Sequence, residues 1–381
     1  MKVYFIEDRT MKLLPISLLA VKLCLSATLG LAQEVNTEAP QEIVISANRL
    51  PQAANLVMAA TTIIERNAIR SSQSQSLIEL LSGQLGMQLA QSGGQGAQTS
   101  LFMRGTESDH TLILIDGVQL TNSTGAAGRP ELIPLDQIER IEIVRGPRSS
   151  IYGSEAIGGV INIITNTDVE PGFGGNISVT AGTQDSNNTN LGLQGGNEST
   201  TLALNLSHRE TSGINFRESG SADEDGFEND TAALSLSHLF NNKVSFLANY
   251  SRFDSSSDYD DGNVDIESQQ LSAGFSFALT ENWSSSVRVE RFEEENNDMS
   301  AFGTTKSQSK NNKINWHNAL FLDDANQFVF GVDHIEQKLE YASFGAVQTD
   351  TSRDNDGIYG VYLRNAELAE LTVSLRHDDN E

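Results

Sequence analysis

The sequence is poor in the residues that cross-linked or nucleic-acid-binding domains need. It has one cysteine among 381 residues, Cys24, so no disulfide can form within the chain. Its 25 Lys and Arg are outnumbered by 51 Asp and Glu, which gives a formal net charge of −26. Contacts with phosphates require a basic surface, so this composition argues against nucleic acid as a partner.

Long apolar runs are also absent beyond the N-terminus, which argues against membrane-spanning helices. The N-terminal segment has a basic start at Met11-Lys12, an apolar stretch, and small residues at Gly30 and Ala32. This order is typical of a secretory signal peptide, and Lys22 interrupts the run too early for an anchor. Residues 1–32 are therefore predicted to be a leader, with 1–10 interpreted as an upstream artefact.

The rest of the chain divides into segments that differ in polarity and in hydrophobic pattern. Residues 33–60 are polar, which predicts a flexible N-terminus with one short β-like island at 42–47. Residues 61–168 form a predicted α+β module. Its expected strands lie at 61–65, 112–115, 140–144 and 160–165, and its expected helical turns at 67–69, 76–84 and 134–138.

Residues 169–381 alternate apolar and polar side chains at a period of two. The pattern predicts strands at 176–180, 201–207, 233–237, 244–250, 271–277, 283–291, 313–321, 327–333 and 357–364. Short linkers alternate with long acidic ones, at 210–230, 253–268, 292–311 and 336–356. A soluble β-sandwich is one interpretation. The alternating linkers, and aromatic residues near the strand ends, favour an antiparallel transmembrane β-barrel.

Three dense motifs lie in the α+β module. They read SLFMRGT at 100–106, LILIDGV at 112–118 and IVRGPRSSIYGSEAIGGVINIIT at 143–165. In this order, before a barrel-like pattern, they strongly resemble the plug of TonB-dependent outer-membrane receptors. The resemblance runs from about residue 42 to residue 168. It implies a mainly β protein of the Gram-negative outer membrane, with an α+β plug at 61–168 followed by a β-barrel.

The resemblance also implies a function and partners. The expected role is energy-coupled uptake of a large scarce nutrient by a monomer in outer-membrane lipid. Within the family the likeness is strongest to cobalamin (vitamin B12) receptors, which share Ala47-Asn48-Arg49, and a ferric siderophore is the alternative ligand. The second class of function considered is a structural surface barrel protein that carries out no transport. An enzyme is not expected, because the sequence has no nucleophile elbow, HExxH motif or Cys/His cluster.

The segment 42–47 occupies the place of the family's TonB box. Such a box adds a strand to the sheet of the energy-coupling protein TonB, and main-chain hydrogen bonds supply the affinity. The β-branched residues in its centre suit that role. The predicted box consists of Glu42, Ile43, Val44, Ile45, Ser46 and Ala47.

Four plug residues are expected to be structural: Arg104, Asp116, Arg145 and Arg148. A buried charge is tolerated only when it is paired. Arg104 and Arg145 are therefore predicted to pair with carboxylates on the barrel wall and to form a latch.

The resemblance assigns substrate and metal positions residue by residue. The substrate positions are Gln98, Ser100, Glu107, Gly125, Ala126 and Thr305, of which Ser100 and Thr305 keep the family's residue type. Acidic loops of cobalamin receptors hold Ca²⁺, which prefers six to eight oxygen ligands. The matching positions here are Asp223, Asp225, Tyr259, Asp260 and Asp265, with Asn215 and Ser221 as changed residues.

The length of the chain limits how many barrel strands it can contain. Plugged transporters close about 22 strands, and residues 169–381 hold roughly ten strands of membrane length. An open sheet edge in lipid would leave backbone groups unpaired. The sequence is therefore expected to represent a truncated chain with about the first half of its barrel.

Overall fold

A computed structural model describes residues 43–44, 47–50, 52–53, 57, 59–120, 128–165, 171–216, 224–260, 262–323, 325–366 and 369–381. The predicted leader lies outside the described residues. Contacts separate Met1–Pro40 from Gln41–Glu381, and the second unit contains both the plug and the large sheet. No helix in the described part of the chain is long and apolar enough to cross a membrane.

The plug is built on a five-stranded sheet of order β3-β8-β9-β6-β7, in which β6 and β9 are parallel. A hairpin of β4 and β5 lies beside it, and a two-residue pairing of β1 with β2 precedes it. The strands are β1 Ile43–Val44, β2 Gln52–Ala53, β3 Ala60–Glu65, β4 Met87–Gln91, β5 Thr99–Met103, β6 Thr111–Ile115, β7 Val118–Gln119, β8 Ile138–Arg145 and β9 Gly159–Thr165.

Short helices connect these strands. They are α1 Arg66–Ser72, α2 Leu77–Ser82 and α3 Ser149–Tyr152, with 3-10 turns η2 Ser108–His110, η3 Pro130–Leu132, η4 Leu135–Gln137 and η5 Ser154–Ala156. The predicted strands and helical turns of this module are thus confirmed, whereas the β4–β5 hairpin was not foreseen. The central strands are apolar on both faces because β6, β8 and β9 pack into one core with α2.

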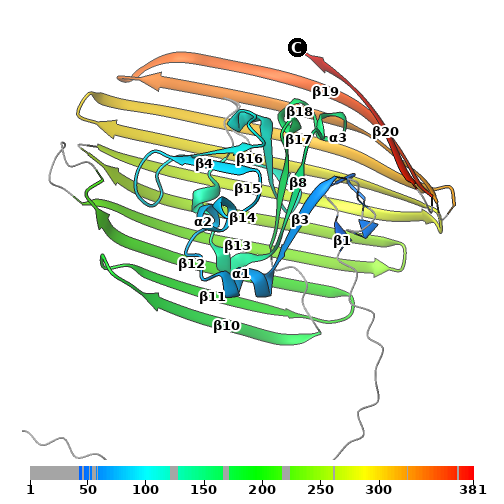
Figure 1. Ribbon diagram of the computed structural model, residues 1–381, viewed down its shortest axis with the longest axis horizontal. Coiled ribbons are helices and arrows are strands. Elements are labelled where there is room, and N and C mark those ends of the chain that lie inside the picture. Colours follow the sequence, from blue (N-terminus) through cyan, green and yellow to red (C-terminus); the bar gives the residue numbers. More distant parts are fainter. Residues whose placement is uncertain are drawn as a thin grey trace, which may run out of the picture. The chain divides into compact units, whose positions relative to one another are not determined.

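Residues after the plug form one antiparallel sheet of eleven strands in chain order, β10 to β20 (Figure 1). They are β10 Gly172–Ala181, β11 Asn187–Gly196, β12 Thr200–Ile214, β13 Asp225–Asn241, β14 Val244–Tyr259, β15 Gly262–Thr280, β16 Trp283–Ser300, β17 Gly303–Phe321, β18 Asn326–Ser343, β19 Ala346–Ala366 and β20 Ala369–Asn380. The predicted barrel-type sheet is confirmed over these strands.

The predicted long loops are largely wrong. Residues 253–268, 292–311 and 336–356 are paired strand apart from tight turns, since β14 ends at 259 and β15 begins at 262. The reason is that the outward face of these strand halves is largely polar, and the inward face carries only a few apolar residues, such as Phe253, Ile266 and Phe292, which pack against the plug. The alternation that marks a strand is therefore weak in the sequence. Between β12 and β13 the break is longer, and residues 217–223 lie outside the described residues.

The outward face of the large sheet is divided into two bands. Exposed apolar side chains occupy the strand halves beside the short turns, and on β15 they run from Leu271 to Leu279. That stretch spans about 26 Å along the strand, close to the lipid-facing band of about 25 Å in outer-membrane barrels. Charged residues such as His208, Asp230 and Arg252 occupy the other halves.

Glycines let the plug approach the wall of strands closely. Gly96 has φ of +75°, and a Cβ there would lie 2.1 Å from Cδ2 of Phe227 on β13. Gly117 has φ of +82°, and its Cβ would lie 2.7 Å from Nη1 of Arg288 on β16. Both positions need glycine for its backbone conformation and for the lack of a side chain.

Candidate functional site

The predicted TonB box leads into a docked segment. Ile43 and Val44 pair antiparallel with Ala53 and Gln52. Ala47 is fully buried against Val144 of the plug sheet. Residues 47–50, part of the predicted flexible N-terminus, are thus packed against the plug sheet at Ala47. Glu42, Ile45 and Ser46 lie outside the described residues.

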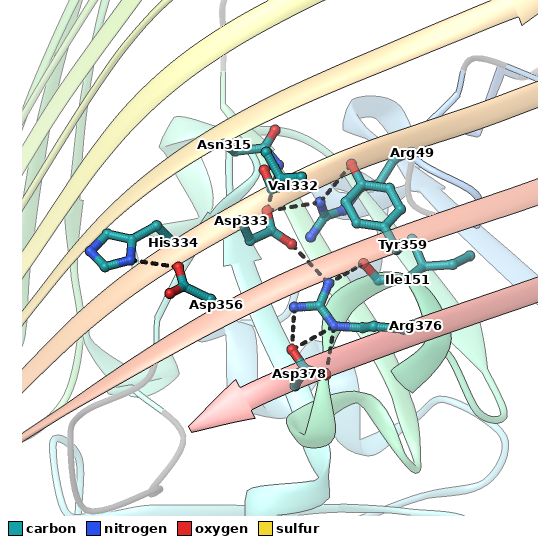
Figure 2. Close-up of polar contacts among 10 residues, drawn as sticks. All are labelled: Arg49, Ile151, Asn315, Val332, Asp333, His334, Asp356, Tyr359, Arg376 and Asp378. Carbon is teal, nitrogen blue, oxygen red and sulfur yellow. Dashed lines mark hydrogen bonds and ion pairs between the residues drawn. The ribbon is translucent and has the colours of Figure 1, made fainter. Parts of the chain in front are cut away.

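Arg49, two residues after the predicted box, reaches the wall. Its Nη1 donates to Oδ1 of Asp333 on β18 at 3.4 Å and to the hydroxyl of Tyr359 on β19 at 3.1 Å (Figure 2). Its guanidinium also lies 4.5 Å from the ring centroid of Tyr152 on α3 and 4.9 Å from that of Tyr359. The Arg49 guanidinium is thus in contact with one carboxylate and two aromatic rings.

The backbone of Arg49 is strained. Its φ is 54°, in the left-handed region, which costs a non-glycine residue about 1–2 kcal/mol. The contacts with Asp333 and the two tyrosines must offset that cost. The segment is therefore kept in place by a few specific side-chain contacts.

A second arginine lies on the same carboxylate. Arg376 on β20 donates from Nη1 to Oδ2 of Asp333 at 2.8 Å, and its Nε and Nη2 bind Asp378 at 2.9 and 2.7 Å. Figure 2 shows Asp333 between the two arginines, whereas His334 and Asp356 pair to one side of them. Asn315 also donates to Oδ1 of Asp333.

Electrostatics favour the charged form of this site. Burial alone would lower the pKa of Arg49, but Asp333 and the oxygens of Tyr359 and Tyr152 outweigh it and raise that pKa. Burial raises the pKa of Tyr152 to about 12, so its ring stays neutral beside the arginine. Arg49 therefore remains protonated throughout the physiological range of pH.

The predicted latch through Arg104 and Arg145 is wrong. Arg145 donates to the carbonyl of Leu85 at 2.7 Å and to Thr62 at 2.7 Å, both within the plug. Arg104 is exposed, and no described carboxylate of the wall lies within ion-pair distance of either arginine. The physical reason is that both arginines line the plug's own Gly86 and Gly146 turns.

Asp116 and Arg148 play structural parts within the plug. The carboxylate of Asp116 accepts from the backbone N and the hydroxyl of Thr165 at 2.9 and 2.8 Å. Burial nonetheless raises the pKa of Asp116. The Arg148 carbonyl accepts the amides of Ile151 and Tyr152 at 2.9 Å and so starts α3.

Among the described residues, most hydrogen bonds between the wall and the plug run from a wall side chain to a plug backbone carbonyl. Such a bond does not depend on which side chain the plug residue carries. The bonds are Arg209 to Glu131 at 3.2 Å, Asn229 to Leu132 at 3.0 Å, Gln270 to Ile115 at 3.3 Å, Arg288 to Asp116 at 2.9 Å and Arg376 to Ile151 at 3.5 Å.

The predicted substrate residues that the structure describes lie on separate elements of the plug and the wall. Ser100 lies on β5, and Gln98 precedes it in the loop that closes on Ser92. Glu107 precedes η2, and Thr305 lies on β17 opposite Asp298. Gly125 and Ala126 lie outside the described residues.

The predicted calcium ligands are divided between the two faces of the sheet. Asp225 is buried on the inward face, where its Oδ2 accepts the Phe216 amide at 2.8 Å. Asp265 pairs with Ser256 and accepts its hydroxyl at 2.9 Å on the outward face, opposite to the face that carries Asp225. Tyr259 donates to Asp298. Asp223 and Ser221 lie outside the described residues.

The remaining positions, Asn215, Asp225, Tyr259 and Asp260, each offer a side-chain oxygen, a donor type that suits Ca²⁺. With one oxygen from each, these four residues supply fewer than the six to eight ligands of a full calcium shell. The described residues thus fit part of a calcium site.

A cavity of about 730 Å³, which the sequence did not indicate, lies between the plug and strands β10 to β13. Its lining includes Arg66, Arg70, Gln95, Arg209 and Asp225. Arg66 is committed to the carbonyls of Leu135 and Asp136. The cavity reaches the end of the sheet where β10 turns into β11, since Gly182, Thr183, Gln184 and Ser186 line it.

Sequence reasoning missed Arg49, Asp333, Tyr359 and Arg376 as a site. Two signals were present. Arg49 lies two residues after the predicted box, and Asp333 is an acidic residue on the inward face of β18, where it follows the buried residues Val329 and Gly331 at a spacing of two.

Comparisons with known proteins agree with this geometry. A family model described as TonB-dependent Receptor Plug Domain matches residues 54–160. The Vitamin B12 transporter BtuB of Vibrio cholerae is 32% identical over 368 residues, which covers 91% of this chain and 58% of that protein. The chain therefore spans less than two thirds of that relative's length.

Solved structures share the fold. The ferric enterobactin receptor PfeA of Pseudomonas aeruginosa superposes with a TM-score of 0.73 at 18% identity, over 89% of this chain and 59% of that one. The siderophore receptor PirA of the same organism gives 0.67 at 21% identity, over 84% and 56%. At such identities the likeness concerns the fold alone.

Proposed function

The chain belongs to the TonB-dependent receptor family, and we propose that it serves energy-coupled uptake of cobalamin across the outer membrane. Receptors of this family are outer-membrane proteins of Gram-negative bacteria. The cobalamin assignment is supported by the 32% identity to a vitamin B12 transporter. A ferric siderophore is the second candidate, because the structural neighbours named above are siderophore receptors.

One observation carries the coupling proposal: the segment that holds the predicted TonB box is tied to the wall by Arg49. Ala47 is buried and Arg49 binds Asp333, so the Ala47 end of the box is held against the plug until these contacts break. A partner that adds the box to its own sheet must compete with this docked state. Ligand binding would signal to TonB only if the ligand favours the released state.

The wall-to-plug bonds suit such a cycle. They run mainly from wall side chains to plug carbonyls. Each contributes about 1 kcal/mol in net terms, so the plug is held by many modest contacts. A pull on residues 42–47 would break them one after another.

We further propose that Ca²⁺ orders the end of the sheet near Asp225 and Tyr259. The side-chain oxygen atoms of Asp225 and Tyr259 would act as ligands. Asn215 and Asp260 would join them, since each directly follows the last residue of a strand, β12 and β14. The bound ion would offset the negative charge of these turns.

The test uses the full chain and a purified periplasmic domain of TonB. We expect the two to bind, and binding to strengthen when cyanocobalamin is present. Deletion of residues 42–47 should abolish binding, whereas Gln84→Ala, a change away from the box on the turn after α2, should leave it intact. TonB binding that ignores the deletion would contradict the coupling proposal.

A separate pair of titrations tests which ligand the chain binds. Cyanocobalamin and ferric enterobactin are titrated separately against the full chain by tryptophan fluorescence. Saturable quenching by cyanocobalamin alone supports the cobalamin assignment. Saturable quenching by the ferric chelate alone would replace it with the siderophore alternative.

A further inference from the structure

Asp333 has a different cation on each of its two carboxylate oxygens. Arg49 contacts Oδ1 at 3.4 Å and Arg376 contacts Oδ2 at 2.8 Å. The Asp333 side chain is 1% exposed and that of Arg376 is 5% exposed, so water compensates neither charge. The shorter bond belongs to the arginine on the sheet, and the longer bond to the arginine on the N-terminal segment.

Arg376 is fixed independently of Arg49. It binds Asp378 through two nitrogens on its own strand, at 2.9 and 2.7 Å. Its Nη1 also lies 3.5 Å from the carbonyl of Ile151 in the plug. The hydroxyls of Ser374 and Ser150 meet at 2.6 Å beside it. Release of Arg49 therefore breaks none of the contacts that position Arg376.

A buried carboxylate that loses its only cation is strongly destabilised, because the charge is left uncompensated. If Arg49 were alone on Asp333, undocking of the N-terminal segment would incur that full penalty. With Arg376 in place, Asp333 keeps a charged hydrogen-bond donor when Arg49 leaves.

We propose that Arg376 is a positioning residue that competes with Arg49 for Asp333 and so makes docking of the box segment reversible; this inference rests on the proposed TonB coupling. Asp378 sets the strength of the competition, because Arg376 divides its donors between Asp378 and Asp333. Loss of Arg376 leaves Arg49 as the main cation for Asp333 and strengthens docking. Loss of the Asp378 charge directs Arg376 toward Asp333 and weakens docking.

The experiment follows the docked segment with a single thiol. Cys24→Ser removes the chain's one cysteine, and Ala47→Cys places a small thiol at a fully buried position beside Val144. A maleimide reagent then reacts only when residues 47–50 leave their site. The reaction rate is measured on the full chain in detergent micelles, without TonB, for Arg376→Gln and Asp378→Asn.

The two variants are expected to change the rate in opposite directions. Arg376→Gln should slow labelling by about tenfold and Asp378→Asn should speed it by about tenfold, a size set by one charged hydrogen bond. Arg353→Gln is the matched control, because that arginine lies on the neighbouring strand β19 and binds Gln337 instead of Asp333. It should leave the rate unchanged.

A merely structural role for Arg376 predicts a different result. In that case both variants loosen the same corner of the sheet and both speed labelling. Faster labelling in Arg376→Gln, or no change in either variant, would overturn the proposal. Because the assay contains no TonB, such a result is distinguishable from a failure of the TonB-binding test.

Discussion

Gly96 of the plug lies directly against the ring of Phe227 on β13, at a separation that leaves no room for a methyl group. A Cβ at Gly96 would lie 2.1 Å from Cδ2 of that ring and 2.4 Å from the hydroxyl of Ser257. The ring belongs to the same buried cluster as the plug core. Plug and wall are thus packed as one interior at this point.

Gly96→Ala should therefore destabilise the docked plug. The positive φ alone costs about 1 kcal/mol, and the clash with a buried ring adds about 1–3 kcal/mol. Gly105→Ala is the control, since Gly105 has φ of +78° but nothing within 4 Å of its Cβ. Denaturant unfolding in micelles measures both, and equal losses in the two variants would mean that the plug–wall contact contributes nothing.

Glu131 makes stability depend on pH. It is 4% exposed, and burial raises its pKa to about 7 despite the nearby Arg129. Between its ordinary value of 4.5 and about 7, the folded state binds more protons than the unfolded state. The free energy of unfolding should therefore fall as pH rises through this window and level off above it, by an amount of order 3 kcal/mol.

Glu131→Gln should remove that part of the pH dependence while keeping the shape of the side chain. The measurement is the unfolding midpoint at pH 5 and pH 8 for both proteins. Glu107→Gln, at an exposed position in the same domain, is the control. A wild-type protein that gains stability between pH 5 and pH 8 relative to Glu131→Gln would show that the sign is wrong.

Calcium binding should distinguish Asp225 from Asp265. Asp225 is on the inward face and Asp265 is on the outward face of the sheet. If Ca²⁺ binds where we propose, Asp225→Asn should weaken binding about tenfold, because it removes a charged ligand. Asp265→Asn should leave binding unchanged. Calorimetric titration with CaCl₂ gives both values, and equal weakening in the two variants would refute the inward site.

The N-terminus of α2 offers a local stability test. The hydroxyl of Ser76 accepts the Glu79 amide at 3.1 Å, and the Glu79 carboxylate accepts the Gln75 amide at 2.7 Å. Ser76→Ala should destabilise the plug by about 1 kcal/mol. Ser71→Ala, whose hydroxyl bonds only to the carbonyl of Ala68 within α1, should cost less. Thermal unfolding ranks the two, and the reverse order would contradict the cap.

Much of the plug could be predicted from local patterns. The apolar run at 112–115 and the motif at 143–165 correspond to the buried strands β6, β8 and β9. Period-two alternation located the membrane halves of the wall strands, because one face there must be apolar. It failed for the outer halves, where hydrogen bonding to neighbouring strands continues although the outward face is largely polar and few inward residues are apolar.

The sequence by itself determined the family and the order of plug and wall, since these depend on motifs and on local hydrophobic period, and it predicts the place of the box at 42–47. Only the tertiary structure decided that Arg49 meets Asp333, 284 residues away, and that Arg376 shares the same carboxylate. It also decided that Arg104 and Arg145 make no such bond to the wall. The physical reason is that pairing of buried charges depends on strand register and inward orientation, which bring distant residues together and leave no periodic trace in the sequence.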